Sequence, residues 1–254
     1  MSNHAPRFAA YHRWDRAFFL GFVVFAWAGV LGGFVPALAG RFAGRADYVA
    51  PLILHLHAAS FMAWLVLLTV QMLLIRTGRT ALHRRMGMAG AALIPVMVLT
   101  GFFAEVYSQR FHLTHLPDSQ AFFILPIFYV IAFGTLAGLA VFRRGDPASH
   151  KRLIYLATSA IVGAAYARLW GGALYELVGD GFWGMIINTF TGTNLFLLAA
   201  VIFDRVTRGQ LHPVLRTGVP ALLASELVVS WIYHAPGWLP IARAIVTPLP
   251  GPPI

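Results

Sequence analysis

Seven apolar stretches of roughly 20 residues each constrain the fold of this chain more than any other feature. A helix of about 20 apolar residues is long enough to cross the hydrocarbon core of a bilayer. The chain is 59% hydrophobic and 11% charged, which leaves no room for a separate soluble domain. The sequence therefore predicts an all-α bundle of seven transmembrane helices, forming one domain over residues 1–254. The predicted spans are 17–39, 51–75, 87–107, 121–142, 153–175, 182–203 and 219–240.

The basic residues gather on one side of this predicted bundle. With the N-terminus inside, the inner segments carry fourteen of the nineteen Lys and Arg residues. Such an asymmetry orients bacterial membrane proteins with the basic loops in the cytoplasm. It predicts an N-in, C-out, multi-pass protein of the bacterial inner membrane, with residues 1–16 as a cytoplasmic segment and 241–254 as a Pro-rich outer tail. The net charge of +10 is thus an orientation signal, and nucleic acid is not an expected partner.

The predicted inner turns resemble one another. In residues 76–85 and 144–152, a glycine precedes a histidine by five positions, an alanine precedes it by two, and two basic residues follow. Residues 208–213 contain a shorter version of the pattern. This repetition predicts one helix followed by three out-in-out hairpins. A simpler interpretation stays open, because glycine ends helices and basic residues and histidine are tolerated at the membrane interface.

Several functional classes are excluded by what the sequence lacks. The chain has no cysteine, so it contains no disulfide, thiolate metal site or cysteine nucleophile. The seventh predicted span has no lysine, which excludes a retinal Schiff base, and there is no HExxH motif or P-loop. We expect no dedicated metal site, and the sequence identifies no catalytic residue.

Polar side chains inside the predicted spans are the candidate functional residues, because an ionisable group at membrane depth is costly. Depth along each span, at about 1.5 Å per residue, separates them into layers. The outer layer contains His55, His57, Glu105, Arg168 and His234, an intermediate layer contains Gln71, Asn194 and Glu226, and the inner layer contains His83, His150, Asp204 and His212.

The His55-Leu56-His57 sequence is the most unusual of these features. Residues i and i+2 of an α-helix point about 200° apart, so both imidazoles cannot bind one metal ion on a regular helix. His57 is the better candidate for the bundle interior. His57 and His234 are a candidate pair of axial haem ligands, with Arg168 at a haem propionate.

Other arrangements of the same side chains remain open. His83 and His150 are a candidate second pair of haem ligands. A buried histidine such as His57 is more commonly satisfied by a hydrogen bond within the protein. Arg168 needs a counter-charge or an aqueous surrounding, and a structural ion pair with Glu226 fits equally well.

Several short motifs are spread over nearly the whole length of the chain: His55-Leu-His57, Trp64, Gln71, His83-Arg84-Arg85-Met-Gly87, His150-Lys151-Arg152-Leu153, Ala167-Arg168, Asp204 and Arg208-Gly209-Gln-Leu-His212-Pro213. With these residues, the chain resembles a family of uncharacterised bacterial seven-span membrane proteins. The resemblance implies the fold and the membrane location, and it names no activity. A looser, architectural likeness to membrane b-type cytochromes implies haem b as a candidate cofactor held between histidines.

The sequence favours a non-enzymatic function, either as a transporter-like protein or as an accessory subunit of a membrane complex. The alternative is a b-type haem protein that transfers electrons. A lipid-modifying or quinone-modifying enzyme ranks last, because no recognised nucleophile or acid-base pair supports it. The expected partners are the lipid bilayer and either a protein of a membrane complex or a second copy of this chain.

Overall fold

A computed structural model describes residues 8–45, 50–116 and 119–249. Residues 1–7 of the predicted N-terminal segment and 250–254 of the predicted tail lie outside the described residues. The described part is helical and contains no strand. Seven of its helices are long and apolar enough to cross a membrane, which confirms the predicted all-α, seven-span bundle. The protein is therefore a multi-pass integral membrane protein whose apolar helices suit contact with lipid.

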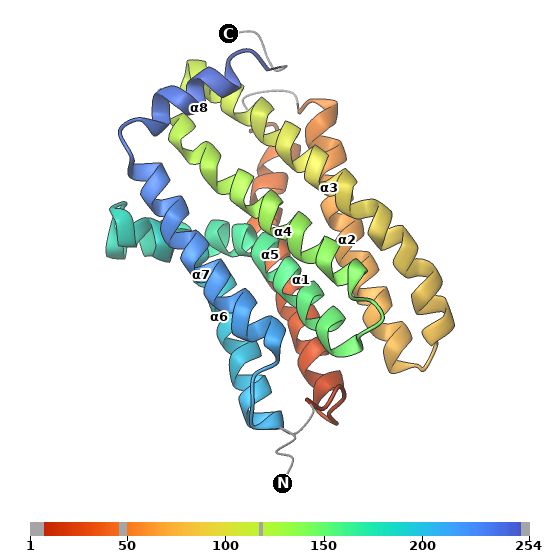
Figure 1. The fold of residues 1–254 in the computed structure, drawn as a ribbon. Helices are drawn as coiled ribbons and strands as arrows, with labels where there is room; N and C mark the ends of the chain where they lie inside the picture. Colours follow the sequence, from red (N-terminus) through yellow and green to blue (C-terminus); the bar gives the residue numbers. More distant parts are fainter. Residues whose placement is uncertain (1–7, 46–49, 117–118, 250–254) are drawn as a thin grey trace.

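The spans are α1 (Asp15–Phe42), α2 (Leu52–Arg76), α3 (Thr80–His115), α4 (Ile124–Phe142), α5 (Pro147–Val178), α6 (Phe182–Arg208) and α7 (Pro213–His234). A short 3-10 helix, η1 (Ser119–Phe123), precedes α4, and α8 (Trp238–Val246) follows α7. In Figure 1, α8 lies across one end of the bundle, and the turns α2–α3, α4–α5 and α6–α7 lie toward the other. We call this second end the basic end, because most of the Lys and Arg residues belong to it.

Two different local devices form the three similar turns at the basic end. Gly78 and Gly209 follow α2 and α6 with φ of 73° and 68°, a conformation that favours glycine. The Asp146 side chain caps α5 by accepting hydrogen bonds from the Ala148 and Ser149 backbone amides, at 3.0 and 3.3 Å. The similar sequences therefore produce one topology, but not one backbone conformation.

The seventh span differs from its prediction at both ends. It begins at Pro213 and ends at His234, whereas the apolar pattern predicts 219–240. The chain leaves the helix at Ala235, which has φ −69° and ψ 126°, because the following Pro236 disfavours a helical conformation in its predecessor. The remaining apolar residues form α8, which the sequence pattern had merged with the span.

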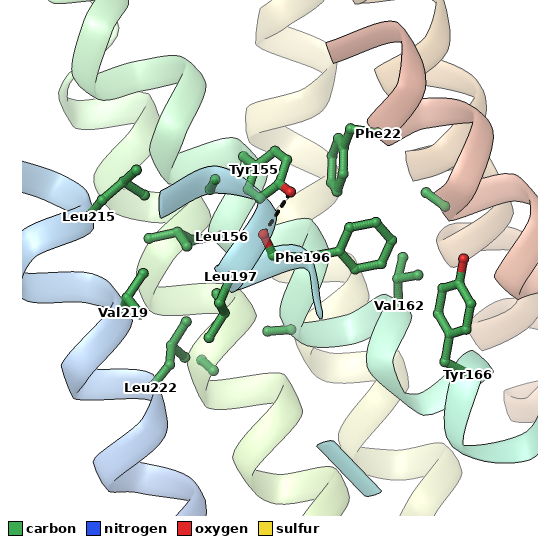
Figure 2. Close-up of a cluster of buried hydrophobic side chains, with 14 of the residues drawn as sticks. Phe22, Tyr155, Leu156, Val162, Tyr166, Phe196, Leu197, Leu215, Val219 and Leu222 are labelled. Atoms are coloured by element: carbon green, nitrogen blue, oxygen red, sulfur yellow. Dashed lines mark hydrogen bonds between the residues drawn. The ribbon is translucent and has the colours of Figure 1, made fainter. Parts of the chain in front are cut away.

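Helix α5 lies at the centre of the bundle and packs against α1, α4, α6 and α7 (Figure 1). In its most apolar stretch 67% of the residues are buried, against 17–33% in the other spans. Figure 2 shows Tyr155 of α5 next to Phe22 of α1, and the Tyr155 hydroxyl donates to the carbonyl of Phe196 on α6 at 2.8 Å.

Small residues allow α1 to approach α5 closely. A Cβ atom on Gly33 would lie 2.2 Å from the backbone oxygen of Ala165, closer than any real contact allows. Glycine at this position therefore fixes where α1 crosses the central helix.

Candidate functional site

Five buried or partly buried charged side chains meet at the basic end. They form what we call the inner charge cluster: Asp15, Lys151, Arg152, Asp204 and Arg208. Asp15 accepts from Lys151 at 2.7 Å and from Arg208 at 2.7 and 2.9 Å. Arg152 forms a bidentate ion pair with Asp204, in which its Nε donates to Oδ2 at 2.9 Å. Nη1 of Arg208 lies 3.7 Å from Oδ1 of Asp204. These contacts join α1, α5 and α6 at one point.

The segment that precedes α1 covers this cluster. The Phe8 ring lies under the guanidinium groups of Arg152 and Arg208, at 4.5 and 5.2 Å. Lys151 donates to the Ala10 carbonyl at 2.7 Å, and Arg208 donates to the Ala9 carbonyl at 2.9 Å. The cavity beside it measures only about 10 Å³, room for one water molecule. The cluster is a closed clamp, not an open binding site.

Sequence analysis placed Asp204 in this layer but missed the cluster. The positive-inside rule accounts for every basic residue near this end, so Arg152 and Arg208 were interpreted as interfacial, although both side chains are at most 5% exposed. The sequence feature that could have revealed the cluster is the position of its two carboxylates, Asp15 and Asp204. Asp204 precedes Arg208 by four residues on one helix, and Asp15 opens the first span next to a basic segment.

His212 lies beside the cluster as the N-cap of α7. Its backbone amide donates to Asp204 at 3.1 Å, and its ring Nδ1 accepts from the Val214 amide at 3.2 Å. Burial, together with the positive charge of Arg152, lowers the pKa of His212 and so favours the neutral ring that the cap requires. Hydrogen bonds from Ser149, first from its hydroxyl, lower the pKa of the Asp146 carboxyl that caps α5.

His83 and His150 lie close together near the basic end. Each is the fourth residue of its helix, and their ring centroids are 6.5 Å apart with an angle of 84° between the planes. The His150 Nδ1 lies 2.8 Å from the Ala140 carbonyl oxygen, and Gln71 donates to the His83 carbonyl at 3.2 Å. The His83 Nδ1 is buried without a hydrogen-bond partner.

This separation is compatible with one metal ion between the rings. Two metal–nitrogen bonds of about 2 Å plus two ring radii give a centroid separation of about 6 Å. The carbonyl that faces His150 Nδ1 is the kind of contact that orients a metal-binding imidazole. Within the described residues, no group of three or more His, Asp or Glu side chains could hold a metal ion. Two imidazoles supply two ligands, the number that a haem iron takes in many b-type sites.

The two histidines of the His55-Leu56-His57 sequence have different surroundings. Both belong to the regular helix α2; His55 is exposed and His57 is half-buried. The His57 ring contacts Phe61, with centroids 4.3 Å apart, and its Nδ1 is buried without a partner. His234 is not its partner, because the His234 ring nitrogens lie 2.8 and 3.1 Å from the carbonyl oxygens of Ser230 and Asp180.

Arg168 lies at the centre of the outer polar residues. Its Nη1 donates to the Ala164 carbonyl at 2.9 Å, and its guanidinium lies 4.9 Å from the Phe34 ring centroid. Three further polar side chains lie, like Arg168, in the outer halves of their helices, and we call these four residues the Arg168 group: Arg168, His57, Glu105 and Tyr129.

Arg168 has no anionic partner within the described part of the chain. None of the ion pairs found there involves Arg168, so the ion pair with Glu226, one of the alternatives that the sequence leaves open, does not form. Glu105 accepts instead from Gln109 at 2.6 Å, and Glu226 accepts from Asn194 at 2.9 Å. Arg168 is exposed, although it lies ten residues, or about 15 Å, inside the end of α5.

A surface groove of about 320 Å³ lies between α4 and α7, apart from these polar residues. Seven apolar side chains and Ser225 line it. An open groove of this composition suits a lipid chain.

Comparisons with protein-family models, curated proteins and solved structures find no match to this chain. The functional interpretation therefore depends on the geometry of the described side chains.

Proposed function

We propose that this protein is a non-enzymatic, transporter-like component of the bacterial cytoplasmic membrane, with its basic end toward the cytoplasm. In this proposal, a polar solute enters from the opposite side and meets the Arg168 group. The observation that supports it is the exposed, unpaired guanidinium of Arg168 at membrane depth.

A charged guanidinium inside a span needs an anion, a water-filled surrounding or a polar ligand. Arg168 has no ion pair with a carboxylate among the described residues, and the outer halves of α2, α3 and α4 carry the polar side chains of His57, Glu105 and Tyr129. An opening that admits water from the outer side satisfies the charge. It also gives a solute access to the unpartnered Nδ1 of His57.

The basic end supports a one-sided opening. The inner charge cluster closes it with ion pairs, and Phe8 covers the two guanidinium groups of Arg152 and Arg208. Access from outside combined with closure inside is the arrangement of a transporter in its outward-facing state.

The absence of cysteine makes the opening directly testable. Two single-cysteine variants, Arg168→Cys and His57→Cys, are treated in intact cells with a membrane-impermeant maleimide. The His57→Cys variant keeps Arg168 in place. Both should react from outside, and much faster than Ile131→Cys, whose native side chain is 60% exposed on the apolar surface of α4. Arg79→Cys, at the basic end, should react only after the cells are permeabilised. Reaction at 57 and 168 no faster than at 131 would refute the opening.

A second candidate function is electron transfer through b-type haem, and the His83–His150 pair favours it. The two rings have the separation and the carbonyl contact expected of axial ligands. A bound haem would supply one-electron chemistry at its iron, while Gln71 would hold the His83 turn in place through its carbonyl.

Absorption spectra of the purified protein, oxidised and reduced with dithionite, test this second function. A Soret band that is lost in His83→Ala and in His150→Ala, but kept in the exposed control His55→Ala, would support it. A colourless, iron-free protein purified from cells supplied with haem precursor would exclude it.

A further inference from the structure

Glu226 and Asn194 form an isolated polar pair in the middle of the bundle. Glu226 is 2% exposed and lies thirteen residues, or about 20 Å, from the first residue of α7. Its Oε2 accepts a hydrogen bond of 2.9 Å from the Nδ2 of Asn194 on α6. The other oxygen of each side chain, Oε1 of Glu226 and Oδ1 of Asn194, is buried without a partner.

Two buried acceptors without a donor, on side chains already joined by one hydrogen bond, disfavour an ionised carboxylate. A carboxylate and an amide oxygen can only accept hydrogen bonds, so neither can satisfy the other. A single proton on Glu226 Oε1 changes this, because the new O–H donates to Asn194 Oδ1 while the existing N–H···O bond is kept. One proton from bulk water therefore satisfies both oxygens and removes a buried charge.

We infer that Glu226 is a proton-binding site in the middle of the membrane, held as a neutral acid in a two-bond ring with Asn194. Its surroundings fit this assignment. None of the ion pairs found among the described residues involves Glu226, so no cation from α4, α5, α6, α8 or η1 contacts it. A titratable group near it is Tyr129 of α4, which packs in one buried cluster with Val229 of α7 and whose hydroxyl donates to the Thr189 carbonyl at 3.3 Å.

This inference does not depend on the proposed opening at Arg168. If both hold, a transporter-like protein has a solute site and a proton site on neighbouring helices, since α5 packs against α6 and α7. The cysteine labelling tests the opening alone, and infrared spectroscopy tests the proton site alone.

The test is an infrared spectrum of the full-length protein in nanodiscs at neutral pH, in H₂O and in D₂O. The wild type should show the carbonyl stretch of a protonated carboxylic acid, shifted to lower frequency in D₂O. Glu226→Gln should lose this band, and its amide can form the same two bonds with Asn194. Glu105→Gln is the matched control, because it removes another buried carboxyl and should leave the Glu226 band unchanged.

A conservative variant keeps the test valid if Glu226→Gln does not fold. Glu226→Asp should retain an acid band at a shifted frequency, and Asn194→Leu should move the band to higher frequency by removing its hydrogen-bond partner. A wild-type spectrum at neutral pH with carboxylate bands that Glu226→Gln removes would overturn the inference. Loss of the acid band on adding sodium, but not choline, would also overturn it and assign the pair to a metal cation.

Discussion

Replacing Asp204 by asparagine should strongly destabilise the protein. The side chain is 1% exposed and accepts two hydrogen bonds from Arg152 and one from the His212 amide, with Arg208 at 3.7 Å. Asparagine keeps one acceptor oxygen but directs an NH₂ group at two guanidinium groups. Breaking a buried ion pair by removing one partner costs about 3–5 kcal/mol, because the other charge stays buried.

A double variant separates the ion pair from the packing around it. Arg152→Met with Asp204→Leu removes both charges of the pair. Apolar replacements of a buried pair are often neutral, and the lost acceptor for the His212 amide costs about 1–2 kcal/mol. The double variant should therefore be more stable than Asp204→Asn, although it carries more substitutions.

The assay is the unfolding free energy in mixed micelles titrated with dodecyl sulfate, followed by tryptophan fluorescence. Arg205→Ala is the control, because Arg205 is exposed, adjoins Asp204 in sequence and bonds only the Gly209 carbonyl, at 3.1 Å. That variant should change stability by no more than about 0.5 kcal/mol. If Asp204→Asn loses less than about 1 kcal/mol, the inner charge cluster is not a structural clamp.

Three further predictions concern packing and capping. Gly33→Ala should cost about 1–3 kcal/mol in the same assay, because its Cβ would meet the Ala165 oxygen, while Gly138→Ala, with open space around it, should be neutral. Folding lowers the pKa of His212, so the unfolded chain binds more protons and stability should fall as the pH drops below neutrality. His212→Asn, which retains a capping acceptor, should reduce this pH dependence of stability. Asp146→Ala should cost about 1 kcal/mol at neutral pH through loss of the α5 cap, and much less in acid, where the wild-type carboxyl is protonated.

The sequence predicted the spans well because apolar length alone determines which segments can cross a bilayer. It predicted helix ends less well. Helix α3 runs over Thr80–His115, whereas the apolar pattern covers 87–107, because Arg84, Arg85 and Gln109 continue the helix beyond its apolar part. Hydropathy marks the part of a helix that suits lipid, while hydrogen bonding and capping determine where the helix stops.

The depth of the polar residues was predictable, but their partners were not. Glu226 and Asn194 were both placed in the intermediate layer, yet their contact depends on how α6 and α7 rotate about their axes. For Arg168 the sequence left open a carboxylate partner or an aqueous surrounding, and the structure places its guanidinium beside the Phe34 ring. Rotation and register depend on packing details such as the Gly33 crossing, which a single sequence with weak periodicity does not specify.

The central position of α5 affects how the chain enters the membrane. Among the spans, α5 shares the lowest mean hydropathy with α7, because protein rather than lipid surrounds most of its surface. Partition into lipid is therefore a weaker force for α5 than for the first four spans, which precede it during synthesis. The surfaces of α1 and α4 that α5 packs against are synthesised earlier, so this packing adds to the weaker partition of α5 into lipid.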